Sequence, residues 1–163
     1  MKIGAALVLM VLSLAPSAVP ARADSFSNQV DEELLIIFQS MDVDGDGLVS
    51  PREADRMITL TFNAIDVNHD RRITPEEFKD FSMGFLYLAQ VRDRVAQFNA
   101  VKSEVFRRWD TNKTGYLDFR DYRGGILNEL TRAASKGNPA DPELSPQDMR
   151  NVRFLREMAE ALQ

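Results

Sequence analysis

Residues 42–53 read DVDGDGLVSPRE. Aspartate stands at positions 42, 44 and 46, glycine at 47 and glutamate at 53. Side chains spaced in this way cannot all converge from one helix or one regular strand. Their oxygens converge only if the backbone wraps around a bound group, and four acidic side chains favour a cation. The stretch therefore predicts a cation-binding turn.

The composition is typical of a globular chain with a real core. The chain has 163 residues, of which 44% are hydrophobic and 28% charged, with a formal net charge of −5. This length suits one domain or two small ones. The chain contains no cysteine, which excludes disulfides and thiolate metal sites. Its single histidine, His69, leaves little scope for imidazole zinc sites or for a histidine-based catalytic triad.

The first 23 residues have the pattern of a secretory signal peptide. Lys2 precedes an apolar run over residues 3–15, and Ala21-Arg22-Ala23 matches a small-x-small cleavage site. The run is shorter than the ~20 residues of a membrane-spanning helix. We expect cleavage after Ala23 and export to the periplasm or the cell exterior; an uncleaved N-terminal anchor is the alternative.

Cleavage would also change the charge of the chain. Loss of Lys2 and Arg22 takes the formal net charge from −5 to −7. Such an acidic chain is a poor candidate for binding nucleic acid or an anionic membrane. We expect no stable membrane insertion after cleavage.

Two further stretches repeat the pattern of residues 42–53. Residues 66–77 read DVNHDRRITPEE and residues 110–121 read DTNKTGYLDFRD. All three are acidic at the first and twelfth positions, polar at the third and fifth, and apolar at the eighth. Apolar residues at helical spacing flank each stretch. The sequence thus predicts a repeated helix–loop–helix unit.

A fourth stretch, residues 137–148, shares only part of the pattern. Ser145-Pro146 repeats the helix-start signal of Ser50-Pro51 and Thr74-Pro75, in which a capping hydroxyl precedes proline at the first helical position. Leu144 falls at the apolar eighth position, but the early carboxylates are missing. The stretch is either a degenerate fourth loop without ligands or an ordinary proline-rich turn.

The repeat resembles the EF-hand, a calcium loop between two helices. The template D-x-[DN]-x-[DN]-G-x5-E fits residues 42–53 without exception. The resemblance covers most of residues 31–162, and the layout is similar to that of small secreted bacterial EF-hand proteins. It implies an all-α fold of two paired EF-hand units joined by short two-residue β bridges. A calcium-binding, non-enzymatic protein is the expected function.

The spacing of the loops predicts how the units are grouped. We expect one pair over residues 24–86, with loops 42–53 and 66–77. We expect a second pair over residues 87–163, with loop 110–121 and the degenerate hand near 137–148. In each pair the eighth residues should meet, with Val49 facing Ile73 and Leu117 facing the region of Leu144. Residues 79–98 between the pairs either bend at Gly84 or form one long helix.

The resemblance also implies the metal ligands. Calcium takes six to eight oxygens, from carboxylates, amides, hydroxyls, carbonyls and water. Leu48, Arg72 and Tyr116 would contribute backbone carbonyls, and Ser50 would act through water. The expected ligands are Asp42, Asp44, Asp46, Leu48, Ser50 and Glu53; Asp66, Asn68, Asp70, Arg72, Thr74 and Glu77; and Asp110, Asn112, Thr114, Tyr116, Asp118 and Asp121.

The three loops are expected to differ in affinity. Gly47 permits the left-handed turn of the first loop. Arg71 replaces it in the second, at a cost of ~1–2 kcal/mol, so binding there should be weaker. The third loop ends in Asp121, whose arm is one methylene shorter than that of glutamate. It should bind calcium weakly. Fewer ligands favour a six-coordinate geometry, which suits Mg²⁺ better than a seven-ligand cage does.

Two functions are compatible with these features. The first is an exported calcium-binding protein in which metal holds helix pairs together, with a structural or buffering role. The alternative is a sensor or adaptor that exposes an apolar groove to an unidentified protein partner when calcium binds. Its groove would draw on Met41, Met57, Met83, Met149 and Met158, which are otherwise ordinary core residues. The sequence has no nucleophile elbow, phosphate-binding glycine loop or HExxH motif that would indicate an enzyme.

Overall fold

The computed structural model describes residues 22–81, 84–138 and 140–163. The expected signal peptide therefore lies outside the described residues, apart from its last two positions. Met83, expected in the apolar groove, also lies outside them. No helix in the described ranges is both long and apolar enough to cross a membrane.

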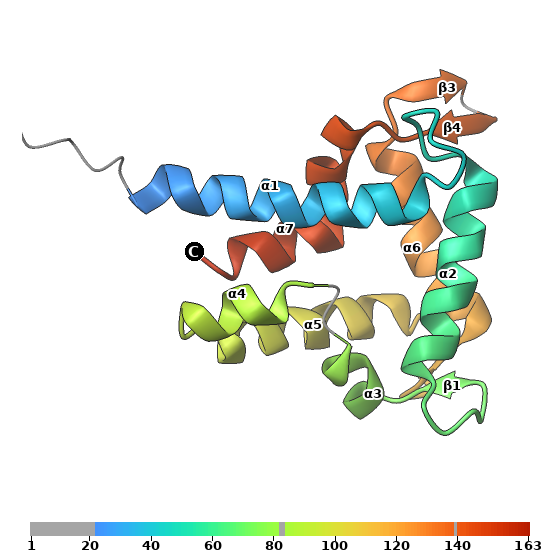
Figure 1. The fold of residues 1–163 in the computed structure, drawn as a ribbon. Helices are drawn as coiled ribbons and strands as arrows, with labels where there is room; N and C mark the ends of the chain where they lie inside the picture. The colour runs from blue at the N-terminus through green and yellow to red at the C-terminus, as the bar shows by residue number, and fades with distance from the viewer. Residues whose placement is uncertain (1–21, 82–83, 139) are drawn as a thin grey trace, which may run out of the picture.

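Helices dominate the described chain, and the strands are very short (Figure 1). The prediction of an all-α fold with short β bridges is confirmed. The elements are α1 (Arg22–Met41), α2 (Pro51–Ile65), β1 (Arg72–Ile73), α3 (Pro75–Asp80), α4 (Leu86–Val91), α5 (Val95–Trp109), β2 (Leu117–Asp118), α6 (Phe119–Ala133), β3 (Lys136–Asn138), β4 (Asp141–Glu143), η1 (Pro146–Asn151) and α7 (Arg153–Glu160).

Helices α2 and α3, which begin at a proline, have the N-terminal cap that their sequences predict. At α2, Ser50 Oγ accepts a hydrogen bond from the Glu53 N–H at 3.4 Å, and the Glu53 carboxylate accepts one from the Ser50 N–H at 2.9 Å. Thr74 and Glu77 make the same exchange at α3. A cap of this kind stabilises a helix by about 1 kcal/mol. It also fixes the glutamate that ends each loop.

Helices α2 and α6 pack against each other, at the right of the view in Figure 1. Helix α2 leaves loop 42–53 and enters loop 66–77, while α6 leaves loop 110–121 and enters the segment before β3. The two helices are joined by a hydrogen bond from Tyr122 Oη to Thr61 Oγ1 at 2.9 Å. An ion pair from Arg123 Nε to Asp55 Oδ1, at 2.8 Å, joins them at the surface.

The strand pairs connect loops that lie far apart in the sequence. Strand β1 pairs with β2, so that Ile73 faces Leu117. At the other end of α2, Val49 bridges Leu144 through backbone hydrogen bonds of 2.8 and 3.1 Å. The predicted partners, Val49 with Ile73 and Leu117 with Leu144, are therefore wrong.

The length of α2 explains this correction. The 15 residues of α2 connect the two loops without a break. At 1.5 Å per residue, a helix of this length is about 22 Å long, so loops 42–53 and 66–77 are held at its opposite ends. Neither can reach the other, and each pairs with a loop from the second half of the chain. The division into units 24–86 and 87–163 stays a prediction.

Segment 137–148 occupies the position of a fourth EF-hand, with a short hairpin in place of a long loop. Strands β3 and β4 form an antiparallel hairpin in which Gly137 has φ +71°. A Cβ at Gly137 would lie 2.2 Å from the Asp141 carbonyl oxygen, so the turn needs glycine. Leu144 then supplies the bridge to Val49 that an eighth loop residue would supply. This arrangement favours the degenerate fourth hand over an ordinary turn.

The stretch between the second and third loops is broken, not one long helix. Helix α3 ends at Asp80, α4 begins at Leu86, and α5 begins at Val95. Gly84 has φ +86°, and Asp93 between α4 and α5 has φ +57°. Of the two alternatives for residues 79–98, the bend at Gly84 is the one found.

Trp109, at the end of α5, joins four helices in the core. Its ring makes edge contacts with Phe78, Tyr122 and Phe154, with ring centroids 5.4–5.8 Å apart. Its Nε1–H donates to Glu129 Oε1 at 3.1 Å. The other oxygen of Glu129 accepts the Phe154 N–H at the start of α7 at 2.6 Å. Rings from α3, α6 and α7 thus contact the indole of α5, and a buried carboxylate fixes its orientation.

Lys102 is a buried lysine that sequence periodicity does not reveal. Its ammonium on α5 donates to the carbonyl oxygens of Lys79 and Phe81 at the end of α3. Burial lowers its pKa to about 8, against an opposing effect of Asp80. The side chain ties α5 to the C-terminus of α3, where a positive charge is favourable.

Lys102 should make stability depend on pH. The pKa of Lys102 is about 8 when folded, against an ordinary value of 10.5, so the unfolded chain binds more protons between these values. The free energy of unfolding of the native chain minus that of the Lys102→Met chain should therefore rise as pH increases through this range. Urea unfolding at a series of pH values measures it. The exposed-lysine control Lys136→Met should show no such slope, and a flat difference for Lys102→Met would contradict the assignment.

Candidate metal centre

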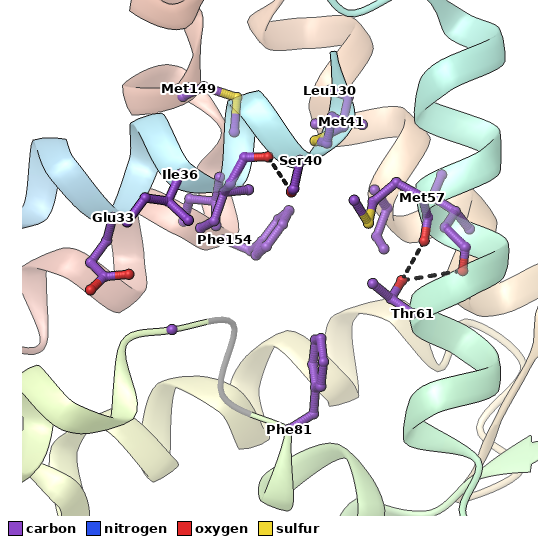
Figure 2. A pocket seen from close by; sticks show the side chains of 15 residues that line it. Glu33, Ile36, Ser40, Met41, Met57, Thr61, Phe81, Leu130, Met149 and Phe154 are labelled. Carbon is purple, nitrogen blue, oxygen red and sulfur yellow. Dashed lines mark hydrogen bonds between the residues drawn. The ribbon is translucent and has the colours of Figure 1, made fainter. Parts of the chain in front are cut away.

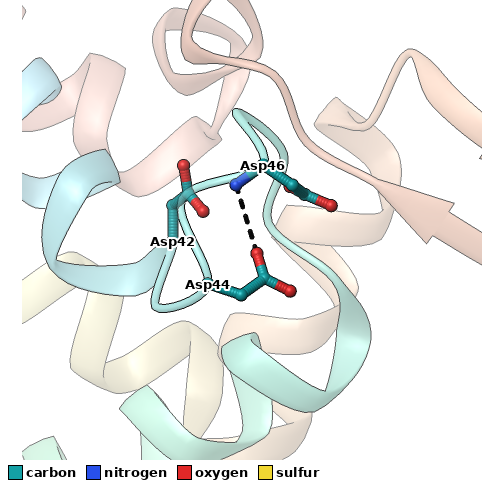
Figure 3. A group of neighbouring side chains, drawn as sticks. All are labelled: Asp42, Asp44 and Asp46. Atoms are coloured by element: carbon teal, nitrogen blue, oxygen red, sulfur yellow. Dashed lines mark hydrogen bonds between the residues drawn. The ribbon is translucent and has the colours of Figure 1, made fainter.

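Loop 42–53 brings its aspartates together. One carboxylate oxygen from each of Asp42, Asp44 and Asp46 lies within 4.8 Å of the other two (Figure 3). The Asp42 carboxylate accepts hydrogen bonds from the N–H groups of Gly45 at 2.9 Å and Gly47 at 3.1 Å. Asp44 Oδ1 accepts one from the Asp46 N–H at 3.2 Å. These bonds bend the backbone around the three carboxylates.

Glu53 closes this loop from the first turn of α2. Its Oε1 accepts the Val43 N–H at 2.7 Å, and its Oε2 accepts Ser50 Oγ at 2.8 Å. Burial acts to raise the pKa of Glu53, but hydrogen bonds from Ser50, Val43 and Asp44 outweigh it and lower the pKa. The carboxylate is therefore held ionised and in contact with both ends of the loop.

The three loops share one backbone conformation. In each, the sixth-position N–H donates to the carboxylate of the first position: Gly47 to Asp42 at 3.1 Å, Arg71 to Asp66 at 2.9 Å, and Gly115 to Asp110 at 2.9 Å. The fourth and sixth positions have positive φ in all three loops: Gly45 and Gly47, His69 and Arg71, and Lys113 and Gly115. The sequence repeat is thus a structural repeat.

Loop 66–77 has the same frame with fewer carboxylates. Asp66 is buried, and its Oδ1 accepts the Asp70 N–H at 3.1 Å. Glu77 Oε1 accepts the Val67 N–H at 3.2 Å, as Glu53 does in the first loop. The Thr74 N–H lowers the pKa of Glu77 most, and this outweighs the effect of burial. The Asn68 amide donates to Asp70 Oδ2 at 3.3 Å.

In loop 110–121, more of the expected ligand oxygens than in the other two loops accept hydrogen bonds from side chains of the loop itself. Asp121 is buried, and its two oxygens accept Thr111 Oγ1 at 3.3 Å and Asn112 Nδ2 at 2.9 Å. Thr114 Oγ1 donates to the Tyr116 carbonyl at 2.9 Å. Asp118 caps α6 by accepting the Asp121 N–H at 2.8 Å. A cation here must displace bonds between its expected ligands, which is a physical reason for weaker binding.

Comparison with known families agrees with this geometry. Residues 54–127 match the model of an EF-hand domain pair, and residues 35–55 match that of an EF hand. The chain is an EF-hand protein. No curated protein and no solved structure matches the chain. The matched domain pair contains loops 66–77 and 110–121, which are the two loops that β1 and β2 join.

The donor atoms of this EF-hand protein fit a hard divalent cation. The groups that converge in its loops are carboxylate, amide, hydroxyl and carbonyl oxygens, which calcium prefers. Among the residues that the structure describes, three carboxylates approach within 4.8 Å only in loop 42–53. His69, the one imidazole, is exposed at a fourth position. Membership of the family and this donor set support calcium binding; the ligand assigned to each position stays a prediction.

Arg71 provides a test of backbone strain in the second loop. Its φ is +66°, where a side chain costs energy that glycine avoids. Arg71→Gly should raise stability in calcium by about 1 kcal/mol. Arg71→Gln is the matched control, because it removes the same charge and keeps the Cβ. Thermal unfolding in calcium measures both; equal melting temperatures for the two variants would show that charge, and not strain, dominates.

One carboxylate in the fourth hand has a role that was not expected from the sequence. Asp148, at the twelfth position of segment 137–148, is buried, and its Oδ2 accepts Ser135 Oγ at 2.9 Å and the Ser145 N–H at 2.8 Å. Burial acts to raise its pKa, but these hydrogen bonds outweigh it and lower the pKa. Two serines thus occupy the carboxylate. The spacing Ser-Pro-x-Asp was the available signal, since it matches Ser-Pro-x-Glu in the first hand.

Proposed function

We propose that this EF-hand protein is an exported calcium-binding protein in which the ions hold the helices together, in a structural or buffering role. The observation that carries the proposal is the connection of the loops through shared helices and strand pairs. Loops 42–53 and 66–77 stand at the two ends of α2, and each is bridged to the second half of the chain. An ion that orders one loop therefore acts on helices from both halves.

The residues of the first loop show how this would work. Asp42 directly follows α1, and Glu53 belongs to the first turn of α2. A cation held between these two carboxylates would fix the angle between α1 and α2. Such loops repel themselves when empty, so the free energy of binding adds to the free energy of folding. Asp110 and Asp121 stand in the same relation to α5 and α6.

Thermal unfolding in chelator and in calcium tests the structural role. We expect a higher melting temperature in calcium and a larger helical signal. A calorimetric titration with calcium and then magnesium would give the number of filled loops and show whether loop 110–121 prefers Mg²⁺. Identical melting temperature and spectra in chelator and calcium would contradict the proposal.

A second candidate, a calcium sensor, is supported by one cavity. An apolar cleft of about 230 Å³ lies between α1, α2, α6 and α7 (Figure 2). Met41, Met57 and Met149 line it, together with Phe81 and Phe154. Three of the methionines expected in a groove thus face one space. Flexible thioethers suit a surface that adapts to a protein partner.

Fluorescence of the dye ANS distinguishes the two roles. A sensor opens its helices on binding calcium and should enhance ANS fluorescence in calcium over EDTA. A structural protein should show the reverse, because its core loosens when the ions leave. A matched variant, Met57→Gln, should abolish the calcium-induced increase of a sensor. It should leave the signal in EDTA largely unchanged if the cleft is only packed core.

Export and the lack of catalysis belong to the same proposal. Export rests on the Lys2-to-Ala23 pattern, and α1 begins at Arg22, so cleavage would remove only its first two residues. The acidic side chains of the loops are engaged in metal-loop geometry, which supports a binding role over acid–base chemistry. Intact mass of the protein recovered from the producing cells tests the cleavage; a mass that includes residues 1–23 would contradict export by this route.

A further inference from the structure

A polar cleft runs along α6 on the side of α5 and α7. Its volume is about 340 Å³, and it begins beside loop 110–121. Four arginines line it, namely Arg108 from α5, Arg120 and Arg132 from α6, and Arg153 from α7. Two carboxylates, Asp121 and Glu129, also line the cleft, so its four guanidinium groups leave the lining net positive in a chain whose formal net charge is −5.

These arginines fall into two kinds. Arg108 donates to Glu129 at 3.1 Å and to Glu157 at 3.0 Å, and Arg153 pairs with Glu157 at 2.7 Å. Arg120 and Arg132 are exposed, and within the described residues neither pairs with a carboxylate. The first kind stabilises the packing of α5, α6 and α7. The second kind leaves two guanidinium groups free to bind an anion.

The floor of the cleft contains a glycine that packing does not explain. Gly124 and Gly125 are adjacent in the interior of α6, where each glycine costs about 1 kcal/mol relative to alanine. Gly125 is required, because a Cβ there would lie 2.4 Å from Trp109. A Cβ at Gly124 would meet no atom within 4 Å, yet this residue lines the cleft. Its lack of a side chain keeps the cleft open.

The spacing of the free arginines decides what kind of anion fits. Arg120, Gly124, Asn128 and Arg132 follow one another at intervals of four residues, and all four line the cleft. Each interval turns by about 40° around the axis, so the row winds along α6. Twelve residues of helix place Arg120 and Arg132 about 18 Å apart along the axis. Two groups so far apart do not converge on a single phosphate. An extended peptide covers the same distance in about five residues, and the Asn128 amide between them can bond its backbone.

We propose that this cleft docks an extended acidic segment of a protein partner, with carboxylates about five residues apart paired to Arg120 and Arg132. Guanidinium groups pair with carboxylates through two parallel hydrogen bonds. The exposed position implies binding that weakens with salt. The inference goes beyond the proposed calcium role and does not depend on it, since all four arginines lie outside the expected ligand set.

A pair of synthetic peptides tests the spacing. The peptide EESSSSEE separates its two charged ends by roughly 17 Å when extended, and EEEESSSS has the same composition with contiguous charges. Trp109, the only tryptophan, lines the cleft and reports binding by fluorescence at one fixed calcium concentration. We expect EESSSSEE to bind more tightly than EEEESSSS, and QQSSSSQQ not to bind.

Variants of the chain test the site itself. Arg120→Gln with Arg132→Gln should weaken EESSSSEE binding about tenfold, since it removes two exposed ion pairs. Arg56→Gln with Lys136→Gln removes the same charge from exposed positions elsewhere and should leave binding unchanged. Gly124→Leu fills the floor without a change of charge and should also weaken binding at least tenfold. Far-ultraviolet circular dichroism confirms that each variant is folded.

Three results would overturn the proposal. Equal binding of the two peptides, or equal loss in both double variants, would show only diffuse attraction to positive charge. Binding of inorganic pyrophosphate as tight as that of EESSSSEE would indicate a site for small anions. Loss of a dimer in Arg120→Gln with Arg132→Gln, seen by sedimentation, would show that the cleft is occupied by a second copy of this chain.

Discussion

Replacement of Glu53 by glutamine is expected to remove the tightest calcium-binding step. Loop 42–53 has four carboxylates at ligand positions, Asp42, Asp44, Asp46 and Glu53, against three in each of the other loops. Glu53 is the group that contacts both ends of the loop and begins α2. Loss of its charge and of one oxygen should weaken this step about 100-fold, or about 2.8 kcal/mol.

Isothermal calorimetry of the unsubstituted chain and of the Glu53→Gln chain, both titrated with calcium, measures this effect. Glu76→Gln is the matched control, because it removes the same charge at a position that is not an expected ligand. Glu76 is exposed in the first turn of α3, next to the glutamate at the twelfth position of the second loop. It should leave the first step unchanged. In chelator the Glu53→Gln chain should unfold within about 1 kcal/mol of the native one, since an amide oxygen still caps α2. Unchanged heat release would show that another loop binds most tightly.

Gly125→Ala is expected to cause the largest loss of stability among the substitutions considered. A Cβ at this position would lie 2.4–2.6 Å from three atoms of the Trp109 ring. The ring cannot retreat, because Phe78, Tyr122 and Phe154 surround it and Glu129 holds its Nε1–H. Overpacking of this kind costs roughly 1–3 kcal/mol, and the upper end applies here.

The adjacent glycine offers the control. Gly124→Ala places a Cβ in open space, so it should stabilise α6 by about 0.5–1 kcal/mol. The two variants change the same atoms in the same turn and should shift the urea midpoint in opposite directions. A loss of stability in both variants would show that helix geometry, and not the contact with Trp109, requires glycine in this turn.

Much of the local structure could be predicted from the sequence. The loop limits, the proline-started helices and the left-handed Arg71 follow from short-range rules, because each depends on residues within one turn or one loop. The bend near Gly84 was one of two alternatives, and the structure has φ +86° there. Local structure can be predicted from a sequence because the interacting groups are close along the chain.

The pairing of the loops could not be predicted by analogy with the EF-hand family, although the number of residues between the first two loops was informative. Residues 54–65 lie between the first two loops, and a helix over this stretch already separates the loops at its two ends. Lys102 and Glu129 were not expected at all, because their burial depends on α3 and α7 packing against α5 and α6. Contacts between distant segments have no signature in the spacing of a single segment.

The crossed strand pairs have a consequence for dissection of the molecule. A cut near residue 86 leaves β1 and Val49 in one fragment, and β2 and Leu144 in the other. Neither fragment retains the β1–β2 pair or the Val49–Leu144 bridge, and each has lost the neighbour that covers its apolar helices. The two pieces are therefore complementary: mixed in solution, they should reassemble as a heterodimer, whereas each alone is left with an unmatched edge.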